Sequence, residues 1–221
     1  LREILRRRVR DGVILRLIGK WLNAGVLEGS ELPHPDAGTP QGGVISPLLA
    51  TVYLHEVLDE WFLRTVRERL VDQAKLIRYA DDFVILCKRK DDAQRVLDVL
   101  PKRFAKYGLT LHPDKTRLVP FRQPDKAPPD EPPSTFNLLG FTHYWSPSRR
   151  GFGVVKKRTA KDRLARAIKR VAAWCREHRH MPVRTQWQAL SRKVRGHFGY
   201  YGVSSNMLAL RAFLRAVIGA W

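Results

Sequence analysis

The chain has 221 residues and a formal net charge of +20 at pH 7, from 41 Lys and Arg against 21 Asp and Glu. A hydrophobic content of 44% excludes a disordered basic tail, and the length is sufficient for a buried core in one or two domains. The excess of positive charge points to a polyanionic partner, nucleic acid before an anionic membrane surface. No apolar run reaches the ~18 residues that a membrane span needs. The two cysteines, Cys87 and Cys175, form neither a disulfide framework nor a zinc set, which predicts a reducing compartment.

The chain begins with two predicted helices. Apolar residues at three-to-four spacing, separated by Arg and Lys, predict a helix over residues 2–27. A loop rich in Gly, Pro and Asp follows at residues 29–43. The second helix is expected to begin at Ser46, with Pro47 in its first turn, and to present one apolar face from Leu54 to Trp61.

The residue period then changes to one typical of β-structure. Two runs rich in β-forming residues, Leu76–Tyr79 and Phe83–Cys87, flank Ala80, Asp81 and Asp82. This pattern predicts a tight hairpin with two carboxylates at its tip. Adjacent carboxylates at a rigid tip can bind hard divalent cations such as Mg²⁺, which prefers oxygen ligands. The alternative is an ordinary Asp-Asp turn, which the apolar flanks and the basic chain disfavour.

Further elements are predicted in the middle of the chain. A helix is expected at about residues 91–107, broken only by Pro101, and a short strand-turn-strand at Leu109–Val119. Six prolines within residues 120–133 predict an extended surface insertion. The apolar segment Phe136–Trp145 then predicts a second hairpin.

The segment Gly38–Gly43, with the sequence GTPQGG, is a second candidate motif. Its three glycines allow the backbone to approach a ligand closely, Pro40 stiffens the loop, and Gln41 offers both hydrogen-bond donors and acceptors. Alone, the segment is best explained as a plain Gly/Pro loop before a helix. Its combination with the Asp81–Asp82 pair, in this order, favours a specific site.

Positive charge is concentrated at the C-terminal end. Residues 156–221, predicted to be all helical, hold 16 Lys and Arg against two acids. Basic side chains bind phosphates, and the interleaved aromatic residues can stack on unpaired bases, although Trp174 and Tyr200 are expected in the helical core. The side chains expected to bind RNA are Lys156, Lys157, Arg158, Arg163, Arg166, Lys169, Arg170, Arg192, Lys193 and Arg195.

Four segments in this order resemble successive motifs of group II intron-encoded reverse transcriptases. They are Gly38–Ala50 (GTPQGGVISPLLA), Tyr79–Asp82 (YADD), Gly108–Val119 (GLTLHPDKTRLV) and Phe136–Phe141 (FNLLGF). The segment Gly196–Gly202 (GHFGYYG) is similar to the thumb, or maturase X, segment of the same proteins. The resemblance covers nearly the whole chain.

The resemblance implies an α+β fold in two domains. Residues 1–150 would form a polymerase-type palm, an antiparallel sheet with helices, which is incomplete at its N-terminus and carries the insertion 120–133. Residues 151–221 would form an all-helical thumb/X domain. The implied location is the bacterial cytoplasm or an organelle.

The resemblance also implies an activity. The function would be that of a mobile-element RNA-directed DNA polymerase that uses two-metal nucleotidyl transfer and also binds its intron RNA for splicing. The alternative is a non-catalytic maturase-like RNA-binding fragment. The cofactor would be Mg²⁺, with Mn²⁺ as a substitute, and the partners would be an RNA template, a DNA primer, group II intron RNA and a dNTP, with no membrane.

By resemblance, individual residues acquire expected roles. Asp81 and Asp82 match the metal-binding aspartates of the palm hairpin. Lys115 matches a lysine near the nucleotide phosphates, a candidate general acid for pyrophosphate, although a solvated surface lysine is the alternative. The primer grip would comprise Leu138, Leu139 and Gly140. The nucleotide- and template-binding residues would be Gly38, Thr39, Pro40, Gln41, Gly42, Gly43 and Tyr79.

The sequence departs from the family pattern near its start. The family has another metal-binding aspartate in a palm strand that would lie upstream of Leu1, and an N-terminal fingers segment. Asp11, within an arginine-rich helix, and Asp36, in a Pro-flanked loop, are not suitable replacements. The 221 residues alone are therefore expected to be catalytically inactive.

Overall fold

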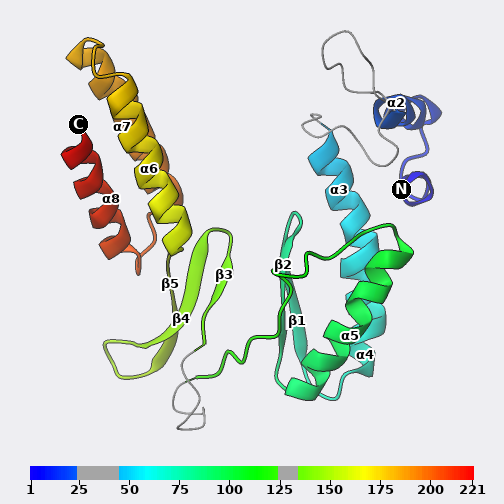
Figure 1. Ribbon diagram of the computed structural model, residues 1–221. Coiled ribbons are helices and arrows are strands. Elements are labelled where there is room, and N and C mark those ends of the chain that lie inside the picture. The colour runs from blue at the N-terminus through cyan, green and yellow to red at the C-terminus, as the bar shows by residue number, and fades with distance from the viewer. Residues whose placement is uncertain (24–44, 124–133) are drawn as a thin grey trace. The chain divides into compact units, whose positions relative to one another are not determined.

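Two compact units, Leu1–Leu118 and Val119–Trp221, make up the chain (Figure 1). The computed structural model describes residues 1–23, 45–123 and 134–221. Both units combine helices with antiparallel strands, which agrees with the predicted α+β class. None of the described helices is long and apolar enough to cross a membrane.

The N-terminal segment forms two helices where one was predicted over residues 2–27. These are α1, Arg2–Arg6, and α2, Gly12–Asn23. Asp11 separates them, because its Oδ1 accepts a hydrogen bond from the backbone N–H of Val13 at 2.7 Å and so starts a new helix. The last four residues of the predicted helix lie outside the described residues.

The second predicted helix is one long helical segment with two π-helical stretches. It consists of α3, Ser46–Leu54, η1, His55–Glu60, η2, Phe62–Val66, and α4, Arg67–Arg69. Pro47 lies in the first turn, as predicted, where its missing N–H breaks no helical hydrogen bond. The predicted apolar face is confirmed, since the buried residues on this helix include Val57, Leu58, Phe62 and Val66.

The predicted hairpin with two aspartates at its tip is confirmed. Strands β1, Ala74–Tyr79, and β2, Asp82–Cys87, pair in antiparallel register. Helix α5, Lys90–Lys106, lies alongside the η1–η2 helix and contacts the hairpin (Figure 1). Pro101 was predicted to break this helix, but α5 continues through it. Leu100 and Phe104 of this helix are buried in the core.

The predicted strand-turn-strand at Leu109–Val119 is wrong. This segment contains a turn in which the amides of Lys115 and Thr116 donate to the carbonyl of His112 at 3.2 and 3.0 Å, without strands on either side. The Pro-rich insertion predicted for residues 120–133 lies outside the described residues from residue 124 onward.

The second unit begins with a three-stranded antiparallel sheet in the order β3-β4-β5. Strands β3, Phe136–Leu138, and β4, Phe141–Pro147, form the predicted second hairpin. Strand β5, Gly153–Thr159, pairs with β4, so the prediction of helix from residue 156 is wrong at its start. This pairing crosses the expected domain boundary at residue 150, whereas the compact units divide between Leu118 and Val119.

Three helices complete the second unit. They are α6, Lys161–Glu177, α7, Val183–Tyr201, and α8, Met207–Ala220. Each contributes to one apolar core, which confirms the predicted stripe on α6. The buried members of this core are Val171, Cys175, Leu190, Phe213 and Val217, with Leu164 and Ile168 packed against them.

Candidate active site and nucleic-acid interface

The β1–β2 hairpin presents Asp81 and Asp82 at an exposed turn. Tyr79 pairs with Asp82 across the strands, so that Ala80 and Asp81 alone connect them. Both aspartates are exposed, and the neighbouring Tyr79 is 68% exposed. The strands themselves are partly buried, and their apolar residues Leu76, Phe83 and Ile85 pack against the core of this unit.

The carboxylates of Asp81 and Asp82 could serve as part of a metal site. Mg²⁺ prefers oxygen ligands and commonly takes one or two protein carboxylates, with waters and substrate phosphates completing its shell. Within the described ranges, three or more His, Cys, Asp or Glu side chains do not gather at one metal-binding position. Asp11 caps α2, which gives it a structural role, and Asp36 lies outside the described residues.

The other residues predicted to bind the nucleotide are not assembled with the hairpin tip by the structure. Lys115 is exposed in the turn after α5, and among the described side chains it makes no ion pair with either aspartate. The segment Gly38–Gly43 lies wholly outside the described residues. The roles of these residues therefore stay predictions.

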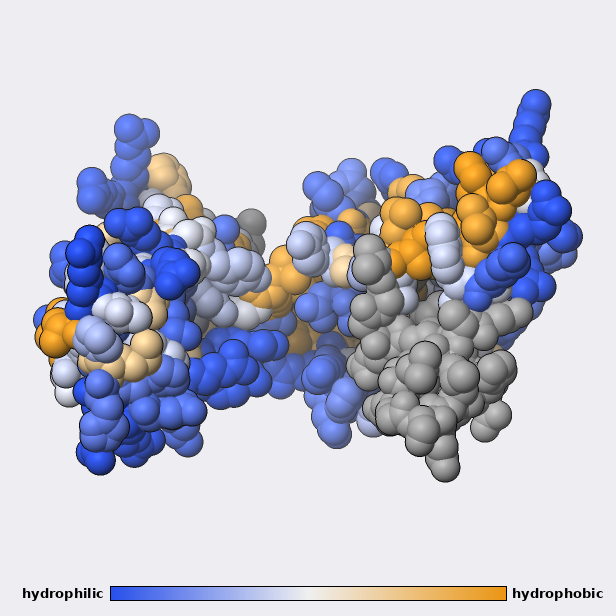
Figure 2. Space-filling view, turned by 90° about the horizontal axis from the view of Figure 1, so that it is seen from above, coloured by the Kyte–Doolittle hydropathy of each residue, from blue (hydrophilic) through white to orange (hydrophobic). Residues whose placement is uncertain are grey.

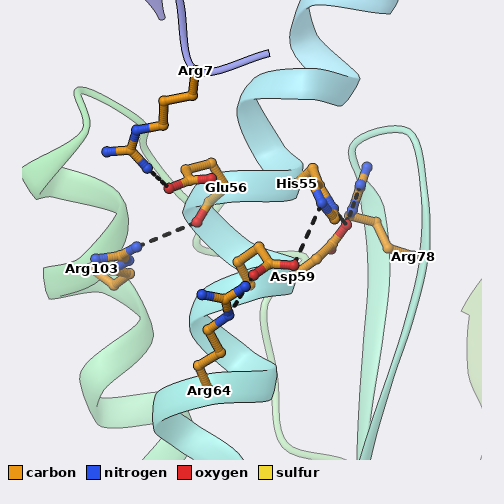
Figure 3. A network of polar contacts seen from close by, with 8 residues as sticks. Arg7, His55, Glu56, Asp59, Arg64, Arg78 and Arg103 are labelled. Carbon is orange, nitrogen blue, oxygen red and sulfur yellow. Dashed lines mark hydrogen bonds and ion pairs between the residues drawn. The ribbon is translucent and has the colours of Figure 1, made fainter. Parts of the chain in front are cut away.

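A polar network on η1 reaches the hairpin from the side (Figure 3). Asp59 accepts two hydrogen bonds from the Arg78 guanidinium, from Nε at 2.7 Å and from Nη2 at 2.5 Å. His55 Nδ1 lies 3.1 Å from Asp59 Oδ2, and Glu60 pairs with Arg64 at 2.7 Å. Burial opposes the charge of Asp59, but hydrogen bonds and charge from Arg78 and His55 outweigh it and keep the pKa of Asp59 below its ordinary value.

The sequence-based prediction of the site missed this network. One signal was available, because Asp59 is an acid beside the predicted buried face of its helix, where a charge requires a partner. The identity of the partner could not be predicted, since Arg78 lies 19 residues further along the chain.

The predicted primer-grip residues form the turn between β3 and β4. Leu139 has a φ of +50° and Gly140 a φ of +76°, so the backbone is left-handed at both positions. Tyr200 Oη donates to the Leu139 carbonyl at 2.9 Å, and a Cβ at Gly140 would lie 2.9 Å from Tyr201 Oη. The C-terminal end of α7 therefore holds this turn in place.

The tyrosines of α7 occupy positions that sequence analysis did not predict. Tyr200 was expected in the core but is 56% exposed, because its ring lies beside the β3–β4 turn and stacks on Phe141. Trp174 is partly buried against the helical core, as expected. The GHFGYY segment is rich in aromatic residues, which could be read from the sequence. Its contact with the β3–β4 turn could not, because Tyr200 and Leu139 are 61 residues apart.

Nine of the ten basic residues predicted to bind RNA are exposed, and Lys156 is partly buried. They extend from β5 over α6 and α7, and Figure 2 shows mostly hydrophilic side chains on the visible face of this C-terminal part, at the left. The Arg158 guanidinium lies 5.1 Å from the Tyr144 ring centre, and Lys193 Nζ lies 5.4 Å from that of Trp174. Each of these contacts holds a positive charge over a partly buried ring and so fixes its position on the surface.

We expect His197 to make the stability of the second unit depend on pH. Its ring stacks on Phe213 with centroids 3.8 Å apart, its Nε2 has no hydrogen-bond partner among the described residues, and burial lowers its pKa. A lowered histidine pKa stabilises the fold above the unfolded value of about 6.5, and this contribution is lost as pH falls. We expect the melting temperature to fall from about pH 7 to about pH 5, and to fall less in His197→Phe.

The control for this prediction is His180→Phe, since His180 is an exposed histidine of the same unit. Its pH dependence of melting should match that of the unmodified chain. An equal pH dependence in His197→Phe and the unmodified chain would contradict the assignment to His197.

The chain belongs to the reverse transcriptase family, because residues 7–143 match the family described as reverse transcriptase (RNA-dependent DNA polymerase). Members of this family are described as RNA-dependent DNA polymerases.

Among curated proteins, the chain is similar to the group II intron-encoded protein LtrA of Lactococcus lactis subsp. cremoris. The two are 26% identical across 95% of this chain and 47% of LtrA. Protein YkfC of Escherichia coli K12 is 32% identical across 53% of this chain and 38% of its own length. These similarities confirm the resemblance to group II intron reverse transcriptases, and the chain spans about half the length of LtrA.

Proposed function

We propose that this chain supplies the catalytic hairpin and the thumb of an RNA-directed DNA polymerase of group II intron type. The exposed Asp81–Asp82 pair at the tip of a two-stranded hairpin, within a reverse transcriptase family match, is the observation that carries the proposal. The unit containing β1 and β2 would be part of the palm, and the helices α6–α8 would form the thumb. Leu138, Leu139 and Gly140 would position the primer 3′ end.

In this proposal Asp81 is the main metal ligand and Asp82 supports it. When bound, Mg²⁺ or Mn²⁺ supplies positive charge that activates the primer hydroxyl and stabilises the departing pyrophosphate. The contribution of the chain is to hold carboxylate oxygens at a fixed exposed turn and to bind the primer-template. Lys115 would donate a proton to pyrophosphate, a role that Lys115→Met would test against Lys115→Arg.

Primer extension tests this function. Residues 1–221 joined to the palm and fingers segments of a group II intron reverse transcriptase should incorporate dNTPs on an RNA template in Mg²⁺. The 221 residues alone should not, because the described part brings together no group of three or more His, Cys, Asp or Glu side chains that could hold a metal ion. Robust incorporation by residues 1–221, lost in Asp81→Ala, would contradict this second expectation.

A non-catalytic RNA-binding module is the competing function. The observation that favours it is the concentration of exposed cations on β5, α6 and α7. The two functions are distinguished by primer extension in the longer protein, because a maturase-like binder would bind intron RNA without incorporating dNTPs.

RNA binding by the basic surface should depend steeply on salt. If about five phosphates are contacted, the logarithm of the association constant should fall with the logarithm of salt concentration with a slope of about −4. Filter binding or anisotropy with a labelled intron RNA measures this slope. Replacement of Arg192, Lys193 and Arg195 by Gln should weaken binding. If each of the three contacts one phosphate, the slope should become shallower by up to about 2 to 3. A flat salt response would contradict the electrostatic interface.

A further inference from the structure

The turn that carries Asp81 contains a strained residue. Ala80 has a φ of +52°, in the left-handed region where a residue with a Cβ costs about 1 kcal/mol or more relative to ordinary backbone. Such conformations persist only where the surroundings impose them. Two adjacent, exposed carboxylates at the same tip add like-charge repulsion, so the turn requires a partner that fixes it.

The Arg78 side chain is that partner. Its Nη1 donates to the Ala80 carbonyl at 2.8 Å, while Nε and Nη2 donate to the two oxygens of Asp59. The Arg78 side chain is 11% exposed and that of Asp59 is 20% exposed, so little water competes for the pair between them, whereas the hydrogen bond to the Ala80 carbonyl lies at the exposed turn. One planar guanidinium thereby ties the hairpin turn to the rigid helix η1 (Figure 3).

The charges around Asp59 keep this connection intact. Hydrogen bonding to Asp59 raises the pKa of Arg78, and Asp59 itself stays ionised because Arg78 and His55 outweigh its burial. His55 Nε2 also lies 3.6 Å from Glu60 Oε1, which fixes the imidazole between two carboxylates. Asp59 is thus held in one position on η1 by partners on two sides.

We propose that Arg78 and Asp59 are positioning residues for the metal-binding tip. They do not touch substrate; by holding the Ala80 carbonyl they fix the direction in which Asp81 leaves the turn. The inference rests on the proposed function of Asp81. Lysine cannot replace Arg78, because an ammonium lacks the planar fork that reaches two carboxylate oxygens and a carbonyl together.

Two measurements on the 221-residue chain test this proposal. The first is hydrogen exchange of the backbone amides of residues 80–83, and the second is the Mn²⁺ affinity of the tip, from paramagnetic broadening of the same amides. In Arg78→Lys we expect amide exchange to become about tenfold faster and Mn²⁺ binding to weaken by a few fold, because one charge-assisted hydrogen bond to the turn is lost. Asp59→Asn should show the same changes to a smaller extent.

Arg103→Lys is the matched control. Arg103 is also partly buried in the first unit, donates to the Val57 carbonyl at 3.0 Å and lies over the Tyr107 ring, but it belongs to α5 and, among the described residues, makes no hydrogen bond or ion pair with the hairpin turn. It should lower the melting temperature without accelerating exchange at residues 80–83. Equally faster amide exchange at residues 80–83 in both variants would mean that Arg78 only stabilises the unit. That result would overturn the proposal.

Ala80→Gly provides a second, independent test. Glycine adopts a positive φ at no steric cost, so the turn should depend less on Arg78 in this background. The Arg78→Lys effect on exchange should therefore be several-fold smaller in Ala80→Gly than in the unmodified chain, a coupling that a double-mutant cycle measures. Additive effects, or unchanged exchange in Arg78→Lys, would overturn the positioning role.

The outcomes separate the two levels of inference. If the unmodified chain does not bind Mn²⁺ at the tip, the proposed metal-binding function of Asp81 fails, whereas the exchange measurements still decide whether Arg78 holds the turn. If Mn²⁺ binds at the tip but with the same affinity in Arg78→Lys, the metal site stands and the positioning role is wrong.

Discussion

Asp81→Asn should lower primer extension by the intact polymerase about 10³-fold or more, equivalent to about 4 kcal/mol of transition-state stabilisation. The substitution keeps the size and shape of an exposed side chain at the hairpin tip, so folding should be unaffected. The lost charge would weaken metal binding at the step where negative charge develops on the phosphates. Single-turnover primer extension at saturating dNTP measures the loss in rate.

Binding and stability distinguish this loss from a general defect. RNA affinity and melting temperature of Asp81→Asn should equal those of the unmodified protein, because the basic surface lies on other elements. Asp82→Asn should cost less, in keeping with a supporting ligand. Asp98→Asn on α5 is the matched control, since Asp98 is exposed and bonds only to Gln94 among the described residues, and it should extend primers normally. An unchanged rate of primer extension in Asp81→Asn would mean that Asp81 does not act in catalysis.

The hairpin that carries these aspartates was predictable because its information is local. Two runs of β-forming residues separated by a minimal turn specify the strands, and their pairing places Asp81 at the tip. The apolar stripes on α6 and on the η1–η2 helix were predictable for the same reason, since helical periodicity is a property of neighbouring residues. Local pattern thus determined which elements carry the site.

The contacts that hold the two turns were not predictable, because they join residues far apart in sequence. Arg78 meets Asp59 across 19 residues and Tyr200 meets Leu139 across 61. Strand β5 was missed for a related reason. Its charged residues look like an exposed helix, and only pairing with β4 makes the segment extended.

The two turns to which we assign metal binding and primer positioning are stabilised in the same way. Each contains a non-glycine residue with positive φ, Ala80 in the first and Leu139 in the second. Each strained turn receives a hydrogen bond to a backbone carbonyl from a side chain on or beside a helix, Arg78 in one case and Tyr200 in the other. Precise placement of groups for catalysis requires such support, because an unsupported loop would sample several conformations.

Asn206→Ala should destabilise the second unit by roughly 3 kcal/mol or more, the largest stability loss that we expect from one polar substitution there. Asn206 is 1% exposed, and its side chain joins three elements. Its Oδ1 accepts from the Thr159 amide at 2.7 Å, and its Nδ2 donates to Thr159 Oγ1 at 2.7 Å and to the Tyr201 carbonyl at 2.9 Å. Alanine would leave the buried Thr159 amide without its partner, at about 1–3 kcal/mol, and would remove the hydrogen bonds to Thr159 Oγ1 and to the Tyr201 carbonyl, which keeps a bond from the Val203 amide at 2.8 Å.

The loss should extend to the primer-grip turn, because Asn206 anchors the end of α7 from which Tyr200 and Tyr201 hold Leu139 and Gly140. Thermal melting should therefore shift downward by about 10 °C, and primer affinity of the intact polymerase should weaken together with it. Asn137→Ala is the matched control. Asn137 is exposed and accepts a single hydrogen bond from Thr142, so this substitution should change the free energy of unfolding by no more than about 0.5 kcal/mol. Equal melting temperatures of the two variants would mean that the hydrogen bonds of Asn206 do not stabilise the contact between β5, α7 and α8.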